Sequence, residues 1–217
     1  MNTRQLIVLV VFLSSLVAVA DTEKVPLNQL PMYGSGNKSR FEKEADAQLL
    51  KSIEQQGLSK KEGAKNLARR GWYFFAQRDF KTAMARFNQA WLLDPENGDV
   101  YHGFAVISSE KQSPTKEVEK LFLLSVSKPQ VDATAFVDYG RFLRTEKRFD
   151  EALTQLNKAL ELSASVRNAR ANISFVYYLK NDFAKACDWA KKAKDNKDEL
   201  EKGYLEDMCE RAKADAK

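Results

Sequence analysis

The chain has 217 residues, of which 44% are hydrophobic and 30% are charged, and its formal net charge at pH 7 is +5. This length accommodates one sizeable domain. Charges of both signs are interspersed, and no basic stripe with interleaved aromatic residues is present, so the composition argues against nucleic acid as a partner.

The first twenty residues have the features of a secretory signal peptide. Arg4 supplies a short positive region, residues 6–13 form an unbroken apolar run, and residues 18–20 read Ala-Val-Ala, the small-x-small pattern that signal peptidase accepts. A retained membrane anchor is the alternative, but a spanning helix needs about 20 apolar residues, and two serines interrupt this stretch. We therefore predict cleavage after Ala20, no membrane span after signal removal, and a periplasmic or secreted product.

Residues 21–38 lack helical periodicity and contain two prolines and two glycines. Proline and glycine interrupt regular secondary structure. We therefore predict that this segment is an extended arm.

Two helix start signals follow the predicted arm. Ser39 with Glu42, and Ser59 with Glu62, have the Ser-x-x-Glu spacing of a capping box. In such a box each side chain satisfies a backbone N–H group that the helix itself leaves unpaired. The two boxes, separated by a glycine, predict an N-terminal helix and turn over residues 39–63.

Small and bulky residues then recur at fixed positions, which is the signature of an internal repeat. The unit over residues 64–97 places Leu67, Gly71, Phe74, Ala83, Phe87, Ala90 and Pro95 at positions 4, 8, 11, 20, 24, 27 and 32. The unit over residues 133–166 places Phe136, Gly140, Leu143, Ala152, Leu156 and Ala159 at the same positions, without the proline. The unit over residues 167–197 keeps Ser174, Tyr177, Ala186 and Ala193 in this register.

A degenerate unit over residues 98–132 fills the interval between the first and third units. Its first half carries Tyr101, Phe104 and Ala105, and Ser113-Pro114 opens its second half as a helix cap and first turn. The turns also repeat, as Arg-Asp-Phe at 78–80, Lys-Arg-Phe at 147–149 and Asn-Asp-Phe at 181–183. We therefore predict four units over residues 64–197.

On these residues the chain resembles the tetratricopeptide repeat (TPR) family over about residues 64–200. The stretch 83–95 is also similar to that of exported bacterial proteins of this family. The resemblance implies an all-α fold, a right-handed superhelical solenoid of helical hairpins. Gly71 with Ala83, and Gly140 with Ala152, would allow the two helices of a hairpin to approach closely.

Residues 198–217 are rich in Glu and Lys with a narrow apolar stripe, which suits the polar capping helix that a stack of repeats needs at its end. The two cysteines, Cys187 and Cys209, lie on the last hairpin and on this cap. In an oxidising compartment such a pair favours a disulfide. Two separate buried thiols are the alternative, and a metal site is disfavoured because two cysteines this far apart do not make one.

The sequence lacks the residue sets that catalysis requires. A hydrolase or transferase needs a nucleophile with a base, paired carboxylates or a metal set. His102 is the only histidine and has no motif around it, and the Gly-x-Gly at 34–36 lacks the strand-to-helix context of a phosphate loop. We therefore predict a protein that is not an enzyme and that needs no cofactor or metal.

The resemblance also implies where a partner binds. In the family, the concave groove is lined by positions 2, 5, 9 and 12 of each unit. Transferred to this sequence, these positions include the nine residues that we predict to contact a partner: Trp72, Phe75, His102, Val106, Arg141, Arg144, Asn168, Phe175 and Tyr178. The remaining positions hold Lys65, Ala68, Asp99, Ser109, Thr134, Val137 and Ala171. Arginines can hold carboxylates with two hydrogen bonds and aromatic rings supply apolar contact, so the set suits a peptide or a partner helix.

Two reservations apply to this predicted groove. The family's clamp for C-terminal carboxylates needs Lys and Asn where this chain has Ala68 and Trp72, so that activity is not transferred. Trp72, Phe75 and Tyr178 have an alternative use, which is to pack against the N-terminal helices or the capping helix.

Two functions are consistent with these sequence features. The first is a non-catalytic scaffold or adaptor of the bacterial cell envelope that binds a protein or peptide partner in the concave groove. The second is a structural or assembly factor that self-associates through its arm or through the ends of the solenoid.

Overall fold

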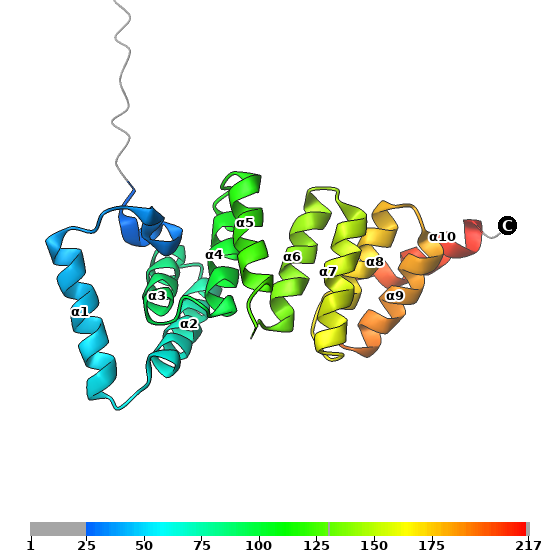
Figure 1. The fold of residues 1–217 in the computed structure, drawn as a ribbon. Coiled ribbons are helices and arrows are strands. Elements are labelled where there is room, and N and C mark those ends of the chain that lie inside the picture. The colour runs from blue at the N-terminus through cyan, green and yellow to red at the C-terminus, as the bar shows by residue number, and fades with distance from the viewer. Residues whose placement is uncertain (1–24, 130, 216–217) are drawn as a thin grey trace, which may run out of the picture.

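The computed structural model describes residues 25–129 and 131–215. The predicted signal peptide, residues 1–20, lies outside the described residues. Within these two ranges all regular secondary structure is helical, joined by turns and loops, and no strand is present (Figure 1). The short 3-10 helices are η1 (Leu27–Gln29) and η2 (Pro31–Ser35), and the α-helices are α1 (Arg40–Gln55), α2 (Lys60–Ala76), α3 (Phe80–Leu93), α4 (Gly98–Glu110), α5 (Thr115–Val126), α6 (Ala133–Thr145), α7 (Phe149–Leu162), α8 (Ala169–Leu179), α9 (Phe183–Asp195) and α10 (Tyr204–Asp215).

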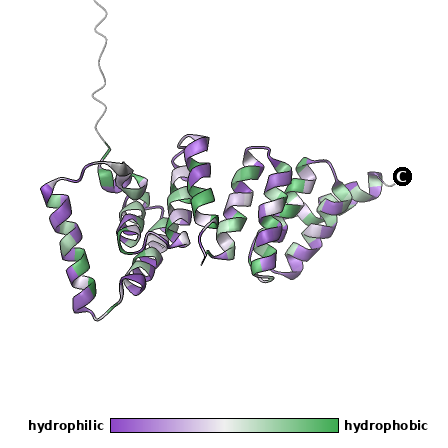
Figure 2. Ribbon diagram, in the orientation of Figure 1, coloured by the Kyte–Doolittle hydropathy of each residue, from purple (hydrophilic) through white to green (hydrophobic). Residues whose placement is uncertain are grey.

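Helices α2 to α9 form four consecutive hairpins in an elongated array, and α10 closes its C-terminal end (Figure 1). Green and purple residues alternate along these helices in Figure 2, as expected for helices that bury one face and expose the other. One apolar core runs through the hairpins from Ile53 to Val176. Among the described helices, none combines the length and apolarity that crossing a membrane demands.

The helix starts follow from side-chain caps. Both predicted capping boxes are confirmed, at Ser39 with Glu42 and at Ser59 with Glu62. Asp79, Asn97, Asp132 and Asp182 accept hydrogen bonds from the first-turn N–H groups of α3, α4, α6 and α9. These acceptors satisfy donors that a helix leaves unpaired, and they fix where each helix begins.

The turns inside the hairpins share one backbone conformation, a residue with positive φ. Two residues after each first helix ends, a residue other than glycine adopts positive φ: Arg78, Gln112, Lys147 and Asn181 have φ between 55° and 60°. Such a residue ends a helix by turning the chain sharply. The repeated tripeptides at 78–80, 147–149 and 181–183 therefore encode one turn geometry.

Small residues allow the two helices of a hairpin to touch. A Cβ atom on Gly140 would lie 2.6 Å from Leu156 Cγ and 3.2 Å from the Ala152 carbonyl oxygen. At the matching position of the last hairpin, the Ser174 hydroxyl donates a hydrogen bond of 2.7 Å to the Ala186 carbonyl oxygen. Glycine allows the close approach of the two helices by leaving room, and serine joins them by a hydrogen bond at the same position.

The ring of Phe87 is held between two glycines. A Cβ on Gly71 of the same hairpin would lie 2.9 Å from this ring, and a Cβ on Gly103 of the next hairpin would lie 2.4 Å from it. Phe87 is fully buried and lies edge-on to Phe104, with ring centroids 6.3 Å apart. The sequence pattern predicts that Gly71 makes room beside Ala83, and the atoms nearest to its missing Cβ belong instead to Phe87 of the same helix, α3. Gly103 had no role in the sequence pattern.

The N-terminal arm differs from the prediction. Residues 27–35 are not extended but form η1 and η2, which lie against α3. The side chain of Asn88, fully buried, accepts a hydrogen bond from the Tyr33 N–H at 3.1 Å and donates to the Asn28 and Leu30 carbonyl oxygens at 3.1 and 2.9 Å. The Asn88 side chain thus satisfies three backbone groups of the arm. These hydrogen bonds hold the arm, with its prolines and glycines, compactly against α3.

The capping helix also begins later than predicted, at Tyr204 and not at residue 198. Asp198 instead caps another helix, because its carboxylate accepts the N–H groups of Arg170 and Ala171 at 3.1 and 3.2 Å. Residues 198–203, which connect α9 to α10, are thereby attached to the N-terminus of α8.

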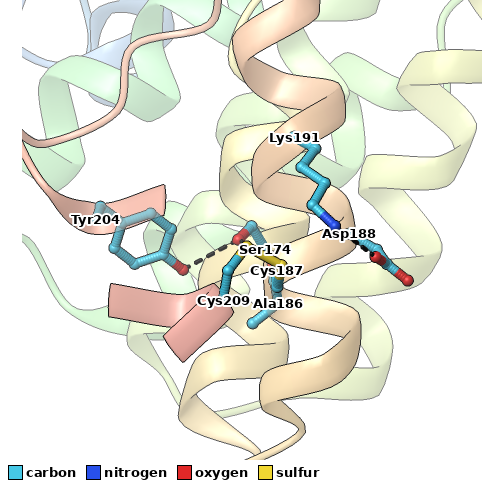
Figure 3. The surroundings of a disulfide bond; sticks show 7 residues. All are labelled: Ser174, Ala186, Cys187, Asp188, Lys191, Tyr204 and Cys209. Atoms are coloured by element: carbon cyan, nitrogen blue, oxygen red, sulfur yellow. Dashed lines mark hydrogen bonds and ion pairs between the residues drawn. A yellow bond between two sulfur atoms is a disulfide. The ribbon is translucent and has the colours of Figure 1, made fainter. Parts of the chain in front are cut away.

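A disulfide joins Cys187 of α9 to Cys209 of α10 (Figure 3). Beside it, the hydroxyls of Ser174 and Tyr204 lie 3.0 Å apart in a hydrogen bond. Together with Met208, which is almost fully buried, these groups form a small core between α9 and α10. The cap is therefore covalently fixed to the last hairpin.

Candidate functional site

The first helices of three successive hairpins are linked by polar side chains. They lie on the face that the TPR resemblance predicts to be concave, which we call the concave face. The Trp72 indole N–H (α2) donates to Asp99 Oδ1 (α4) at 2.8 Å. His102 Nε2 (α4) lies 2.8 Å from Asp138 Oδ2 (α6), and Arg141 pairs with the other oxygen of Asp138 at 3.1 Å. The five residues, which we call the polar chain, cross α2, α4 and α6 through two separate links, because Asp99 Oδ1 and His102 Nδ1 of α4 lie 4.0 Å apart without a hydrogen bond.

His102 lies at the centre of this chain. It is only 2% exposed, and its ring centroid is 4.7 Å from that of Trp72. Its Nδ1 atom is buried without a hydrogen-bond partner among the described residues, and the closest carboxylate oxygen is Asp99 Oδ1 at 4.0 Å. Buried polar atoms normally have a partner, so an unpaired one in a native structure calls for an explanation.

The two carboxylates of the chain experience different environments. Burial raises the pKa of Asp99, and the hydrogen bond from Trp72 opposes this effect only in part. Burial acts on Asp138 in the same direction, but the hydrogen bond that Asp138 accepts from His102 and the charge of Arg141 oppose it, and the pKa of Asp138 is lowered. Asp138 is therefore held as a carboxylate that accepts hydrogen bonds.

A pocket of about 970 Å³ opens beside this chain. It is lined by Lys61, Glu62, Lys65, Trp72, Asp94, Glu96, Asn97, Asp99, His102, Pro129, Val131, Asp132, Thr134 and Asp138. These residues come from the first helices α2, α4 and α6 and from the loops that precede α4 and α6. Of the nine predicted partner-binding residues, Trp72 and His102 line this pocket.

The C-terminal half of the concave face is filled by aromatic rings. Phe175 stacks on Tyr204 of the capping helix, with centroids 5.0 Å apart and planes 2° apart. Tyr178 lies edge-on to both rings, and the guanidinium of Arg144 lies 4.9 Å from the Phe175 centroid. Three predicted groove residues are thus brought together here, in contact with the cap, which is the alternative use that the sequence offered for Tyr178.

The remaining predicted residues are placed separately. Phe75 contacts Trp72 edge-on, with centroids 5.6 Å apart, and Val106 is buried inside α4. Asn168 precedes α8, and its side-chain oxygen accepts the Glu199 N–H at 3.0 Å, so it ties the α9–α10 connection to the body.

Sequence reasoning did not single out Asp138, the residue that connects α4 to α6. It falls outside the groove positions that the family resemblance supplies. The available signal was His102 itself, because a histidine within the apolar run at residues 100–107 needs a polar partner when it is buried.

The described residues contain no group of three or more His, Cys, Asp or Glu side chains arranged to hold a metal ion. The site consists of carboxylates, one imidazole, one indole and two lysines around an open pocket. This arrangement can recognise a polar partner by hydrogen bonds and charge.

No protein-family model matches the sequence, and no curated protein does either. Solved structures do match. The chain superposes on PilF of Pseudomonas aeruginosa with a TM-score of 0.62 and 18% identity, over 71% of each chain. It is similar to YrrB, a TPR protein with an unusual peptide-binding site, with a TM-score of 0.55 and 19% identity over 76% of this chain and 80% of that one.

A third similar structure is PilW, described as a widely conserved type IV pilus biogenesis factor. Its TM-score is 0.56 at 14% identity, over 79% of this chain and 80% of that one. With all these neighbours, the predicted fold class is confirmed: the chain is an all-α solenoid with the fold of TPR proteins. At these identities the likeness concerns the fold.

Proposed function

We propose that the chain is a non-catalytic scaffold or adaptor of the cell envelope that binds a peptide or a helix of a partner protein on its concave face. The observation that carries the proposal is the pocket across α2, α4 and α6, where a polar chain from Trp72 to Arg141 fixes the side chains before any partner arrives. Side chains fixed in advance lose less entropy on binding.

The comparisons support the kind of function. YrrB has a peptide-binding site, and PilW is a type IV pilus biogenesis factor. Export is supported by the pattern of residues 1–20 and agrees with the disulfide between Cys187 and Cys209, because disulfides persist in oxidising compartments. We retain the predicted division into four units over residues 64–197, followed by the cap, as part of this proposal.

Site-specific photocrosslinking in intact cells tests the function. A benzophenone amino acid replaces Lys65 or Thr134, both exposed at the pocket, and matched control positions are Leu123 and Leu162, exposed on the second helices α5 and α7. We expect the pocket positions to crosslink one envelope protein and the control positions to leave it uncrosslinked. Equal crosslinking from both sets, or none from the pocket positions, would contradict the proposal.

A second candidate, self-association, is favoured by α1. The N-terminal end of this helix lies apart from α2 and α3 in Figure 1, although Ile53 near its other end is buried in the core, and its Phe41 is 78% exposed. Phe41 is the most exposed large hydrophobic side chain among the described residues, which makes it the candidate contact with another copy. Sedimentation equilibrium of the exported protein and of Phe41→Ser decides this: a dimer that the substitution dissociates supports the candidate, and a monomer at all concentrations rejects it.

A further inference from the structure

The pocket on the concave face contains more negative than positive side chains without an ion-pair partner. Its carboxylates are those of Glu62, Asp94, Glu96, Asp99, Asp132 and Asp138, and its lysines are Lys61 and Lys65. Lys128 pairs with Glu96 at 3.0 Å and Arg141 pairs with Asp138 at 3.1 Å. The other four carboxylates pair with no lysine or arginine within residues 25–129 and 131–215, so an excess of negative charge remains.

The arginines of the concave face do not reverse this charge. Arg141, although half exposed, already pairs with Asp138, and Arg144 lies against the ring of Phe175. The pocket therefore favours a cationic ligand, although the sequence pattern drew attention to arginines that would hold carboxylates.

The hydrogen bonds of His102 specify what such a ligand must offer. Asp138, as a carboxylate, can only accept a hydrogen bond, so the His102 nitrogen facing it, Nε2, carries the proton. In the neutral imidazole, Nδ1 is then an acceptor, and it has no donor among the described residues. A second acceptor, Asp99 Oδ1, lies 4.0 Å away. Two neighbouring acceptors, one of them unpaired, call for a ligand that brings N–H donors.

We propose that this pocket binds a lysine or arginine side chain of a basic peptide segment, whose N–H groups donate to Asp99 and to His102 Nδ1. The inference rests on the proposed function, because it names the chemistry of the partner at the same site. Lysine and arginine carry several N–H donors and a positive charge, and no acceptor. The Trp72 ring at the pocket adds a surface on which the cation and its aliphatic stem can lie.

The same geometry places the ligand beside the Trp72 indole. His102 Nδ1 is shielded from solvent, and the Trp72 N–H occupies Asp99 Oδ1 at 2.8 Å. Because a carboxylate accepts more than one hydrogen bond, the incoming cation can pair with Asp99 while the indole N–H stays bonded to it. Binding by a basic peptide should thus alter the environment of the Trp72 indole.

Fluorescence anisotropy of the exported protein tests the charge preference. The probes are short fluorescein-labelled peptides of one length in which alanine alternates with lysine, with norleucine or with glutamate. The variant Asp94→Asn/Asp99→Asn/Asp132→Asn removes three negative charges but keeps oxygen acceptors for the local hydrogen bonds. The control Asp150→Asn/Asp188→Asn/Asp195→Asn makes the same charge change at exposed residues of α7 and α9.

We expect the lysine peptide to bind most tightly, and the pocket variant to weaken it about tenfold while the control variant does not. The affinity should fall as salt is raised, because exposed charges are screened. Equal binding of the lysine and norleucine peptides, preference for the glutamate peptide, or an equal loss in both variants overturns the inference. These outcomes leave the proposed function standing if Lys65 and Thr134 still crosslink a partner, whereas a failed crosslink removes the function itself.

Discussion

The groove positions of the repeat have different surroundings in the two halves of the concave face. One half borders an open pocket, and the other is covered by the capping helix. In the N-terminal half, Trp72 is hydrogen-bonded to Asp99, His102 is hydrogen-bonded to Asp138, and all four residues border an open pocket. In the C-terminal half, Phe175 and Tyr178 are covered by Tyr204 of the capping helix. The position in the repeat thus directs a side chain toward the concave face, and the neighbouring element decides whether that side chain meets solvent or a packed ring.

The closed half should depend most strongly on its covalent link. We expect Cys187→Ser/Cys209→Ser to lower the free energy of unfolding by about 3 kcal/mol, because the disulfide no longer restricts the unfolded chain over a segment of this length. Urea unfolding of the exported protein measures this loss.

Unfolding of the wild type under reducing conditions is the matched control and should give the same loss. A variant as stable as the oxidised wild type would show that the cap is held by packing alone.

The open half should depend on the carboxylate between α4 and α6. Asp138→Ala leaves the N–H of His102 Nε2 buried without its acceptor, which costs about 2 kcal/mol. Because the pKa of Asp138 is lowered in the fold, its carboxylate stabilises above the unfolded pKa, and this contribution disappears as pH falls below about 4.

Urea unfolding of the wild type and of Asp138→Asn as a function of pH checks the sign. Their difference in stability should be present at neutral pH and vanish in acid. A difference that grows in acid would contradict the assignment of Asp138 as the ionised member of the pair.

Removal of the Trp72 indole N–H should have a smaller effect on the stability of the open half. Trp72→Phe keeps a ring but leaves the partly buried Asp99 without its donor, so we expect a loss of about 1 kcal/mol. Tyr73→Phe, at an exposed residue of the same helix, should leave the stability unchanged. Equal effects of the two substitutions in thermal unfolding would show that the bond to Asp99 contributes nothing.

The smallest change in stability is expected from a substitution in the turn between α6 and α7. Lys147 has φ of 60° between α6 and α7, a conformation that costs L-residues other than glycine about 1 kcal/mol. We expect Lys147→Gly to raise the free energy of unfolding by about 0.5 kcal/mol, because the backbone freedom of glycine offsets part of the gain. An unchanged or lower melting temperature would reject the strain argument.

The periodic features of the molecule could be predicted from sequence because they follow from residue size and spacing. Gly140, Ser174 and the repeated turn tripeptides determine how closely helices pair and where the chain reverses, and both are local effects. The capping boxes at Ser39 and Ser59 were predictable for the same reason.

The features that were missed depend on contacts between distant segments. Asn88 forms hydrogen bonds to the N-terminal arm about sixty residues before it, and Asp198 caps the N-terminus of α8, 28 residues earlier. Each residue looks like an ordinary polar position until the fold supplies its partner. The acidic character of the pocket was missed because it arises where the loops before α4 and α6 meet α2.

Nuclear magnetic resonance of the isotopically labelled protein, titrated with the lysine peptide, tests the central claim most directly. The chain has three tryptophans, and Trp72→Phe identifies the indole signal of Trp72. We predict shifts of that signal and of the Asp99 and Thr134 amides, with the signals of Tyr178 and Tyr204 unchanged. Shifts confined to the aromatic cluster under the cap, or no shift at the Trp72 indole, would contradict the division of the concave face into an open and a closed half.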